Sequence, residues 1–172
     1  MKIISRAAFV GINVMFKIEK FISDLQDGSY GEHVVWNLLI KQPNVKSIVD
    51  VRDDKNFQKK DIDFLVEDIN RQFTPVEVKT DFKTQDTGNI VYELSCNGGM
   101  GCFEKSDAKV FMYYVPATKT VYEIDAVALR TYLQKVRPEE VPIGDNATGF
   151  ILSVDKLRWE GSIIKKIYTN VI

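Results

Sequence analysis

Asp63, Glu77 and Lys79 are the residues of this 172-residue chain whose types and spacing could do chemistry. Asp63 begins an apolar run, and Glu77 follows it by fourteen residues within Val76-Glu77-Val78-Lys79. Side chains two apart on a strand leave the same face, so Glu77 and Lys79 share one face while the valines point to the opposite, buried face. The pattern therefore predicts carboxylates and a lysine side by side on a sheet.

The segments around these residues predict a β-hairpin. If residues 67–73 form its loop, the strands 62–67 and 74–80 are antiparallel neighbours. Asp63 then lies near the start of its strand and can approach Glu77 from the adjoining strand. A failure of this pairing would remove the predicted site.

Two carboxylates in this position could bind a divalent metal ion. Asp63 and Glu77, together with the backbone carbonyl of Val78, offer the oxygen ligands that Mg²⁺ or Mn²⁺ prefers. Such an ion activates water and neutralises charge on a phosphodiester, while Lys79 could orient the nucleophile or stabilise the transition state. We therefore expect the chemistry of a nuclease.

Three alternatives accompany this interpretation. Asp61 competes with Asp63 for the ligand role, but it lies one step earlier on the same face, at the mouth of the strand, and Asp63 is preferred. Asp81 and Glu93 are candidates for groups that support the ligands. The carboxylates could also form only surface ion pairs with lysines, which contribute little free energy.

A helix is predicted over residues 29–40, before the first strand. Apolar residues at positions 34, 35, 38 and 39 keep helical spacing, and Pro43 ends the pattern. Glu32 lies in its first turn, beside the apolar stripe that must face the sheet. One role for this carboxylate is an interaction with the helix dipole; the other is membership of the site.

Together these four side chains, Glu32, Asp63, Glu77 and Lys79, resemble the motifs of the PD-(D/E)xK nuclease superfamily. The chain has Ile62 where the name of the superfamily has proline. Within the superfamily, the pattern is similar to small phage-type nucleases and to Holliday-junction-resolvase-like nucleases.

The resemblance implies an α/β fold: a restriction-endonuclease-like αβββαβ core, with a mixed central sheet flanked by helices and a β-rich C-terminal extension. It also implies that Asp63 and Glu77 are metal ligands, that Lys79 is the catalytic lysine, and that Glu32 is an additional ligand for the metal or for water. The expected cofactor is Mg²⁺ or Mn²⁺. Nuclease activity on DNA, on structured or recombining DNA in particular, and a homodimer follow from the same resemblance. The alternative is a non-catalytic nucleic-acid-binding or assembly module.

The remaining pattern predicts mostly strands. We expect further strands at 45–52, 89–95, 109–115, 120–124 and 149–154, a helix capped by Asp125 and ending near 134, a flexible connection or poor helix at 96–106 and a loop at 138–147. Four aromatic residues fall within apolar patterns and are expected in the core: Trp36, Tyr113, Tyr114 and Trp159.

Composition predicts one domain over residues 1–172, with a core at about 16–135. Residues 1–14 form a predicted extension if Met15 is the start. A hydrophobic fraction of 45% supports one sizeable core, and the net charge of −1 does not itself indicate a nucleic-acid binder. Two cysteines, Cys96 and Cys102, are too few for a tetrahedral zinc site and indicate a reducing cytoplasm. Local lysines are the candidates for phosphate contacts: Lys59, Lys60, Lys83 and Lys105.

Overall fold

The computed structural model describes residues 28–144 and 146–172. Its first element is a helix over residues 28–39. The following elements are β1 (Val45–Asp50), α2 (Lys55–Gln58), β2 (Phe64–Asp68), β3 (Phe73–Thr80), α3 (Thr84–Thr87), β4 (Asn89–Cys96), β5 (Gly99–Met100), α4 (Cys102–Lys105), β6 (Val110–Val115), β7 (Thr120–Asp125), α5 (Ala126–Val136), β8 (Val141–Gly144), β9 (Ala147–Ser153), α6 (Val154–Trp159) and β10 (Ile164–Tyr168). The predicted N-terminal extension and the start at Met15 lie outside the described residues.

Six strands form a mixed sheet in the order β1-β2-β3-β6-β7-β10. Its pairs are antiparallel except β3 and β6, which run parallel and place Glu77 beside Phe111 and Lys79 beside Tyr113. β6 is almost entirely buried, as its unbroken apolar sequence predicts. The sheet is therefore mixed, as expected.

The β2–β3 hairpin is confirmed, with Phe64 opposite Val76. Its turn is built by Asp68, whose carboxylate accepts hydrogen bonds from the backbone N–H groups of Asn70 and Gln72, both at 2.8 Å. Aspartate commonly closes turns in this way because its short side chain reaches the backbone two residues on. The turn fixes the strand register on which the site depends.

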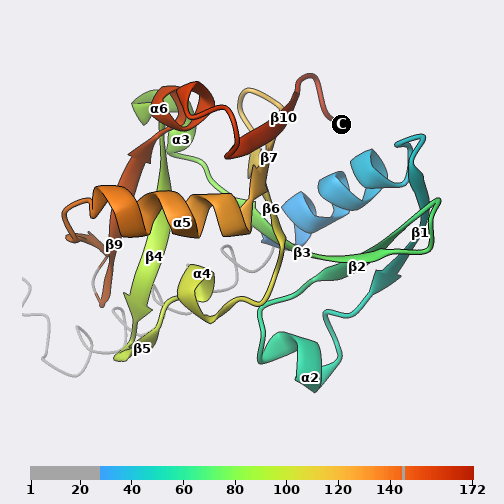
Figure 1. Ribbon diagram of the computed structural model, residues 1–172, viewed down its shortest axis with the longest axis horizontal. Helices are drawn as coiled ribbons and strands as arrows, with labels where there is room; N and C mark the ends of the chain where they lie inside the picture. Colours follow the sequence, from blue (N-terminus) through green and yellow to red (C-terminus); the bar gives the residue numbers. More distant parts are fainter. Residues whose placement is uncertain (1–27, 145) are drawn as a thin grey trace, which may run out of the picture.

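The helix over residues 28–39 and α5 cover opposite faces of the six-stranded sheet (Figure 1). The helix packs Val34, Val35 and Leu39 against the buried face that carries Val76 and Val78. On the other face, α5 packs into a second apolar cluster with residues of β6, β4 and β9. α5 begins at Asp125, whose carboxylate accepts a 2.9 Å hydrogen bond from the N–H of Ala128, as predicted for a cap.

A second sheet, in the order β5-β4-β9-β8, lies beside the first. The chain between β3 and β6 supplies β4 and β5 to this second sheet. The only helices in that segment are the short α3 and α4. β1, β2 and β3 are antiparallel neighbours, and β6 then pairs with β3 in the parallel direction. The single helix of the expected αβββαβ core is replaced here by this excursion.

Other predictions were wrong in detail. The loop expected at 138–147 contains β8. The segment 96–106 was expected as a flexible connection or a poor helix; it holds the four-residue α4, as the second alternative has it, and also a turn to β5 that was not expected. Trp159 was expected in the core but is 89% exposed at the end of α6, whereas Tyr113 and Tyr114 are buried. Trp36 is partly buried and packs edge-on against Phe64.

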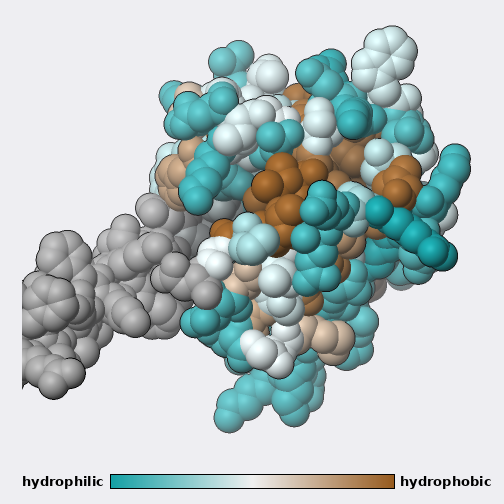
Figure 2. Space-filling model, turned by 90° about the vertical axis from the view of Figure 1, so that its left-hand side faces the viewer, coloured by the Kyte–Doolittle hydropathy of each residue, from teal (hydrophilic) through white to brown (hydrophobic). Residues whose placement is uncertain are grey.

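Apolar side chains gather on the face shown in Figure 2, at the end of the molecule that carries the second sheet. Ile151 and Val136 are exposed there and line a groove of about 480 Å³ with Tyr132 and Leu157. None of the helices in the described residues has the length and apolar character needed to cross a bilayer.

Candidate active site

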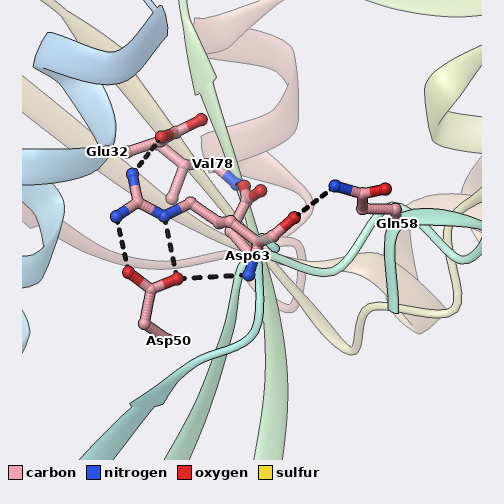
Figure 3. A network of polar contacts seen from close by, with 6 residues as sticks. Glu32, Asp50, Gln58, Asp63 and Val78 are labelled. Atoms are coloured by element: carbon pink, nitrogen blue, oxygen red, sulfur yellow. Dashed lines mark hydrogen bonds and ion pairs between the residues drawn. The ribbon is translucent and has the colours of Figure 1, made fainter. Parts of the chain in front are cut away.

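The candidate site lies where β3 extends beyond the start of its partner β2. Because β2 begins at Phe64, opposite Val76, the last residues of β3 have no antiparallel neighbour on that edge. Asp63 directly precedes β2, and its N–H donates to the carbonyl of Val76 at 2.9 Å. Its carboxylate Oδ2 accepts a hydrogen bond from the N–H of Val78 at 2.8 Å (Figure 3). The side chain of Asp63 thus occupies the place of the missing strand.

The carbonyl of Val78 faces the same edge. The N–H and C=O groups of one strand residue point to the same side, since paired residues in an antiparallel ladder exchange both bonds. The N–H of Val78 is directed at Asp63, so its carbonyl oxygen also lies beside that carboxylate. Asp63 and Val78 therefore offer two oxygen atoms at one strand edge.

Glu77 and Lys79 lie together on the face of β3 opposite the helix over residues 28–39. Lys79 Nζ is 2.7 Å from Glu77 Oε1 and 6.0 Å from the ring centre of Phe103. Glu77 is only 5% exposed, and its Oε2 is buried with no hydrogen-bond partner in the described part of the chain. An unpartnered buried carboxylate oxygen is costly, and a cation would satisfy it.

Both carboxyl groups have raised pKa values. The pKa of Glu77 is raised to about 8, chiefly by burial; the charge of Lys79 opposes this rise and the adjacent Asp63 contributes to it. Burial also raises the pKa of Asp63 to about 6, with a contribution from Glu32, while the hydrogen bond from Val78 and the charge of Lys79 lower it. A carboxyl pair that resists ionisation in this way is characteristic of functional sites.

Glu32 is held at this site by Arg52. The guanidinium forms an ion pair with the carboxylate of Glu32 and donates to Asp50 through Nε at 2.9 Å and through Nη2 at 2.5 Å (Figure 3). It also lies 5.4 Å from the ring centre of Phe64. Gln58 donates to the backbone carbonyl of Arg52 at 2.7 Å, which fixes this segment to α2.

Sequence reasoning missed Arg52. The available signal was weak: an arginine two residues after Asp50, at the end of a predicted strand. The hydrogen bonds from Arg52 hold the pKa of Asp50 below its ordinary value. The network binds the end of β1 to the helix that carries Glu32.

Gly31 allows the helix to approach β3 closely. A Cβ at this position would lie 1.8 Å from Thr80 Oγ1. No other residue type fits without displacing Thr80 or the helix. The glycine before Glu32 therefore brings that carboxylate to the end of β3.

These side chains surround one cavity of about 370 Å³ that opens to solvent. Its lining residues are Gly28, Glu32, Asp63, Glu77, Val78, Lys79, Thr80 and Phe82. All five residues predicted for catalysis and metal binding thus line one cavity. Within the described ranges, no three or more His, Cys, Asp or Glu side chains are grouped to hold a metal ion, so the candidate ligands are two carboxylates and a carbonyl.

The alternative ligand Asp61 does not line this cavity, although its buried Oδ2 also has no hydrogen-bond partner among the described residues. Asp61 Oδ1 forms an ion pair with Lys105 Nζ at 2.8 Å, and the backbone carbonyl of Asp61 accepts a hydrogen bond from the hydroxyl of Ser106. Lys60 forms a 3.1 Å ion pair with Asp107. Two of the lysines predicted to contact phosphate are thus paired with carboxylates.

The other two predicted lysines, Lys59 and Lys83, are exposed. Asp81, a predicted supporting group, accepts hydrogen bonds from the Tyr113 hydroxyl and from the backbone at the start of α3. Glu93 lies on β4, in the second sheet. Cys96 is a free thiol, and the side chain of Cys102 lies outside the described part of the chain.

Neither a protein-family model nor a curated protein matches this chain. Among solved structures, that of a bacterial homing endonuclease, I-Ssp6803I, matches with a TM-score of 0.49 and 13% sequence identity, over 82% of this chain and 88% of that one. A likeness of this size defines neither the family nor the activity of the chain. Function is therefore argued from the site itself.

Proposed function

We propose that this protein is a metal-dependent nuclease that hydrolyses phosphodiester bonds of DNA at the cavity beside β3. One observation carries the proposal. A buried carboxylate oxygen of Glu77, which has no hydrogen-bond partner among residues 28–144 and 146–172, lies in the same solvent-open cavity as the carboxylate of Asp63 and the ammonium of Lys79. Two neighbouring carboxylates, one of them with a free oxygen, and a lysine at hydrogen-bond distance from it suit a cation and a phosphate together.

The residues fit Mg²⁺ or Mn²⁺. Asp63, Glu77 and the carbonyl of Val78 would hold the ion through hard oxygen atoms, and open positions would remain for water and phosphate. When bound, the ion would supply charge neutralisation and activation of water. Because both carboxyl groups have raised pKa values, they must lose protons to become ligands.

Lys79 has two roles in this proposal. Without substrate it pairs with Glu77 at 2.7 Å, which keeps its ammonium directed into the cavity. With substrate it would donate to a non-bridging phosphate oxygen or orient the attacking water, and stabilise the charge that develops in the transition state. Its position on a rigid strand fixes its direction.

Glu32 and Arg52 complete the site from the opposite face of the sheet. Glu32, which is not grouped with the other two carboxylates among the described residues, would bind a water molecule in the cavity. Arg52 is a positioning residue, since its contact with Glu32 and its two bonds to Asp50 limit the orientations of the carboxylate. Lys59 and Lys83 would contact phosphates of the DNA backbone.

Cleavage of a labelled panel tests the proposal. The panel contains duplex, single-stranded, flapped and four-way-junction DNA, with Mg²⁺ or Mn²⁺ and with EDTA. We expect metal-dependent cutting that Lys79→Ala abolishes and that Lys166→Ala, an exposed lysine on the edge strand β10, leaves unchanged. Binding without cutting under every metal would favour the non-catalytic module instead.

The proposed fold relationship and assembly have separate tests. We propose that the arrangement of β1, β2, β3 and β6 relates this protein to the PD-(D/E)xK nucleases, and among them to the enzymes that act on structured or recombining DNA. A homodimer is expected on this basis, and light scattering at micromolar concentration would measure it. A monomer at all concentrations would contradict the dimer but not the site.

A further inference from the structure

Phe82 is an exposed aromatic residue at the rim of the catalytic cavity. It lies three residues after Lys79, in the connection from β3 to α3, and lines the cavity together with Asp63 and Glu77. Its side chain is 46% exposed. An exposed aromatic ring at the mouth of a polar cavity lies where it can contact a ligand bound there.

The backbone on both sides of Phe82 is fixed. The N–H of Asp81 donates to the carbonyl of Tyr114 at 2.9 Å. The carboxylate of Asp81 accepts hydrogen bonds from the N–H of Lys83 at 2.5 Å and of Thr84 at 3.0 Å, and from the hydroxyl of Tyr113. Phe82 is therefore held at the rim by a carboxylate that binds the chain beyond it.

The next residue supplies a charge. Lys83 follows Phe82 directly and is exposed. A rigid aromatic ring followed by a cation beside a phosphodiester-binding cavity is the combination that binds single-stranded nucleic acid: the ring stacks on a base, and the cation contacts the backbone. A base within an intact duplex is already stacked on its neighbours and would have to be unstacked to reach the ring.

We propose that Phe82 stacks on a nucleobase next to the scissile phosphate, so that the site selects DNA in which that nucleotide is unpaired. This inference rests on the proposed nuclease function and deepens it. Phe82 acts in selection of the substrate, whereas Asp63, Glu77 and Lys79 act on the phosphate. Single strands, flaps, gaps and branch points all offer such a nucleotide.

The test measures binding by fluorescence anisotropy in EDTA, where no cutting occurs. Phe82→Ala is compared with wild type on single-stranded DNA and on a blunt duplex. We expect Phe82→Ala to weaken binding of the single strand by roughly 10-fold or more, from the known contribution of base–aromatic stacking, and to change duplex binding by less than about twofold. Phe82→Trp should retain the preference.

Phe73→Ala is the matched control. Phe73 is 51% exposed and lies at the start of β3, at the other end of the strand from Phe82, so its removal tests whether an exposed aromatic residue away from the cavity has the same effect. An equal loss of single-strand and duplex binding in Phe82→Ala, or no loss, would overturn the stacking role. Wild-type protein that neither binds nor cuts any DNA would instead refute the nuclease function, and that failure is visible without the variant.

Discussion

Replacement of Glu77 by glutamine should make the metal-free protein more stable at alkaline pH. The pKa of Glu77 is raised from its ordinary value of 4.5 to about 8, chiefly by burial. Between these values the folded state holds a proton that the unfolded state has released, so stability falls as pH rises through the interval. Glutamine resembles the neutral acid and carries no such dependence.

The size of the effect follows from the two pKa values. At about 1.4 kcal/mol per pH unit, the interval corresponds to at most ~5 kcal/mol of stability lost by wild type between about pH 4.5 and 8. Glu77 is 5% exposed, so solvent does not screen the charge appreciably. We expect Glu77→Gln to match wild type near pH 5 and to exceed it by several kcal/mol near pH 8.5.

The assay is urea unfolding in EDTA at intervals from pH 5 to 8.5, repeated with Mg²⁺. If the proposed site binds Mg²⁺ through the ionised carboxylates, the ion should stabilise wild type increasingly as pH rises, by about 2.7 kcal/mol at a hundred times its Kd. The glutamine variant should gain little. If the free energy of unfolding fell by the same amount in wild type and in Glu77→Gln between pH 5 and 8.5, the assigned burial of Glu77 would be refuted.

Three further substitutions test the surroundings of the site. Arg52→Lys should lower the single-turnover cleavage rate about 10-fold or more, because one ammonium cannot bridge two carboxylates as the guanidinium does; Arg71→Lys, in the distant β2–β3 turn, is the control. Gly31→Ala should destabilise the protein by about 1–3 kcal/mol in urea unfolding, and the added Thr80→Ala should recover part of the loss, since the new Cβ would lie 1.8 Å from Thr80 Oγ1. Lys59→Ala should weaken DNA binding for all sequences and reduce the slope of log K against log salt by about one; an unchanged slope would remove Lys59 from the interface.

The central hairpin could be predicted because its determinants are local. Alternating valines around Glu77, an apolar run after Asp63 and a turn between them determine strands, register and face together. The helix over residues 28–39 could be predicted for the same reason, from the spacing of its apolar residues. These local patterns were sufficient to bring the predicted carboxylates and the lysine to one cavity.

Other features depend on contacts between distant segments. The sequence of β4 predicts a strand but carries no information on which sheet it joins. β10 has two exposed lysines, Lys165 and Lys166, that interrupt its apolar pattern, and β8 has only four residues. Trp159 appears apolar by type, yet it lies two residues after the buried Leu157 and therefore on the opposite side of the helix α6. Arg52 lies outside every periodic pattern and is placed by its carboxylate partners alone.

The parallel pairing of β3 and β6 has a consequence for how the protein assembles. Glu77 and its neighbour Phe111 are adjacent in the sheet, yet the whole of β4, β5 and α4 lies between them in the chain. Pairings between such distant segments form late in folding, since a long loop must close first. The β2–β3 hairpin can therefore bring Asp63 and Glu77 together early, while both are still in water and ionise normally. Docking of β6 beside β3 would help to bury Glu77 and cause it to take up a proton, so proton uptake at neutral pH would report the moment at which β6 joins the hairpin.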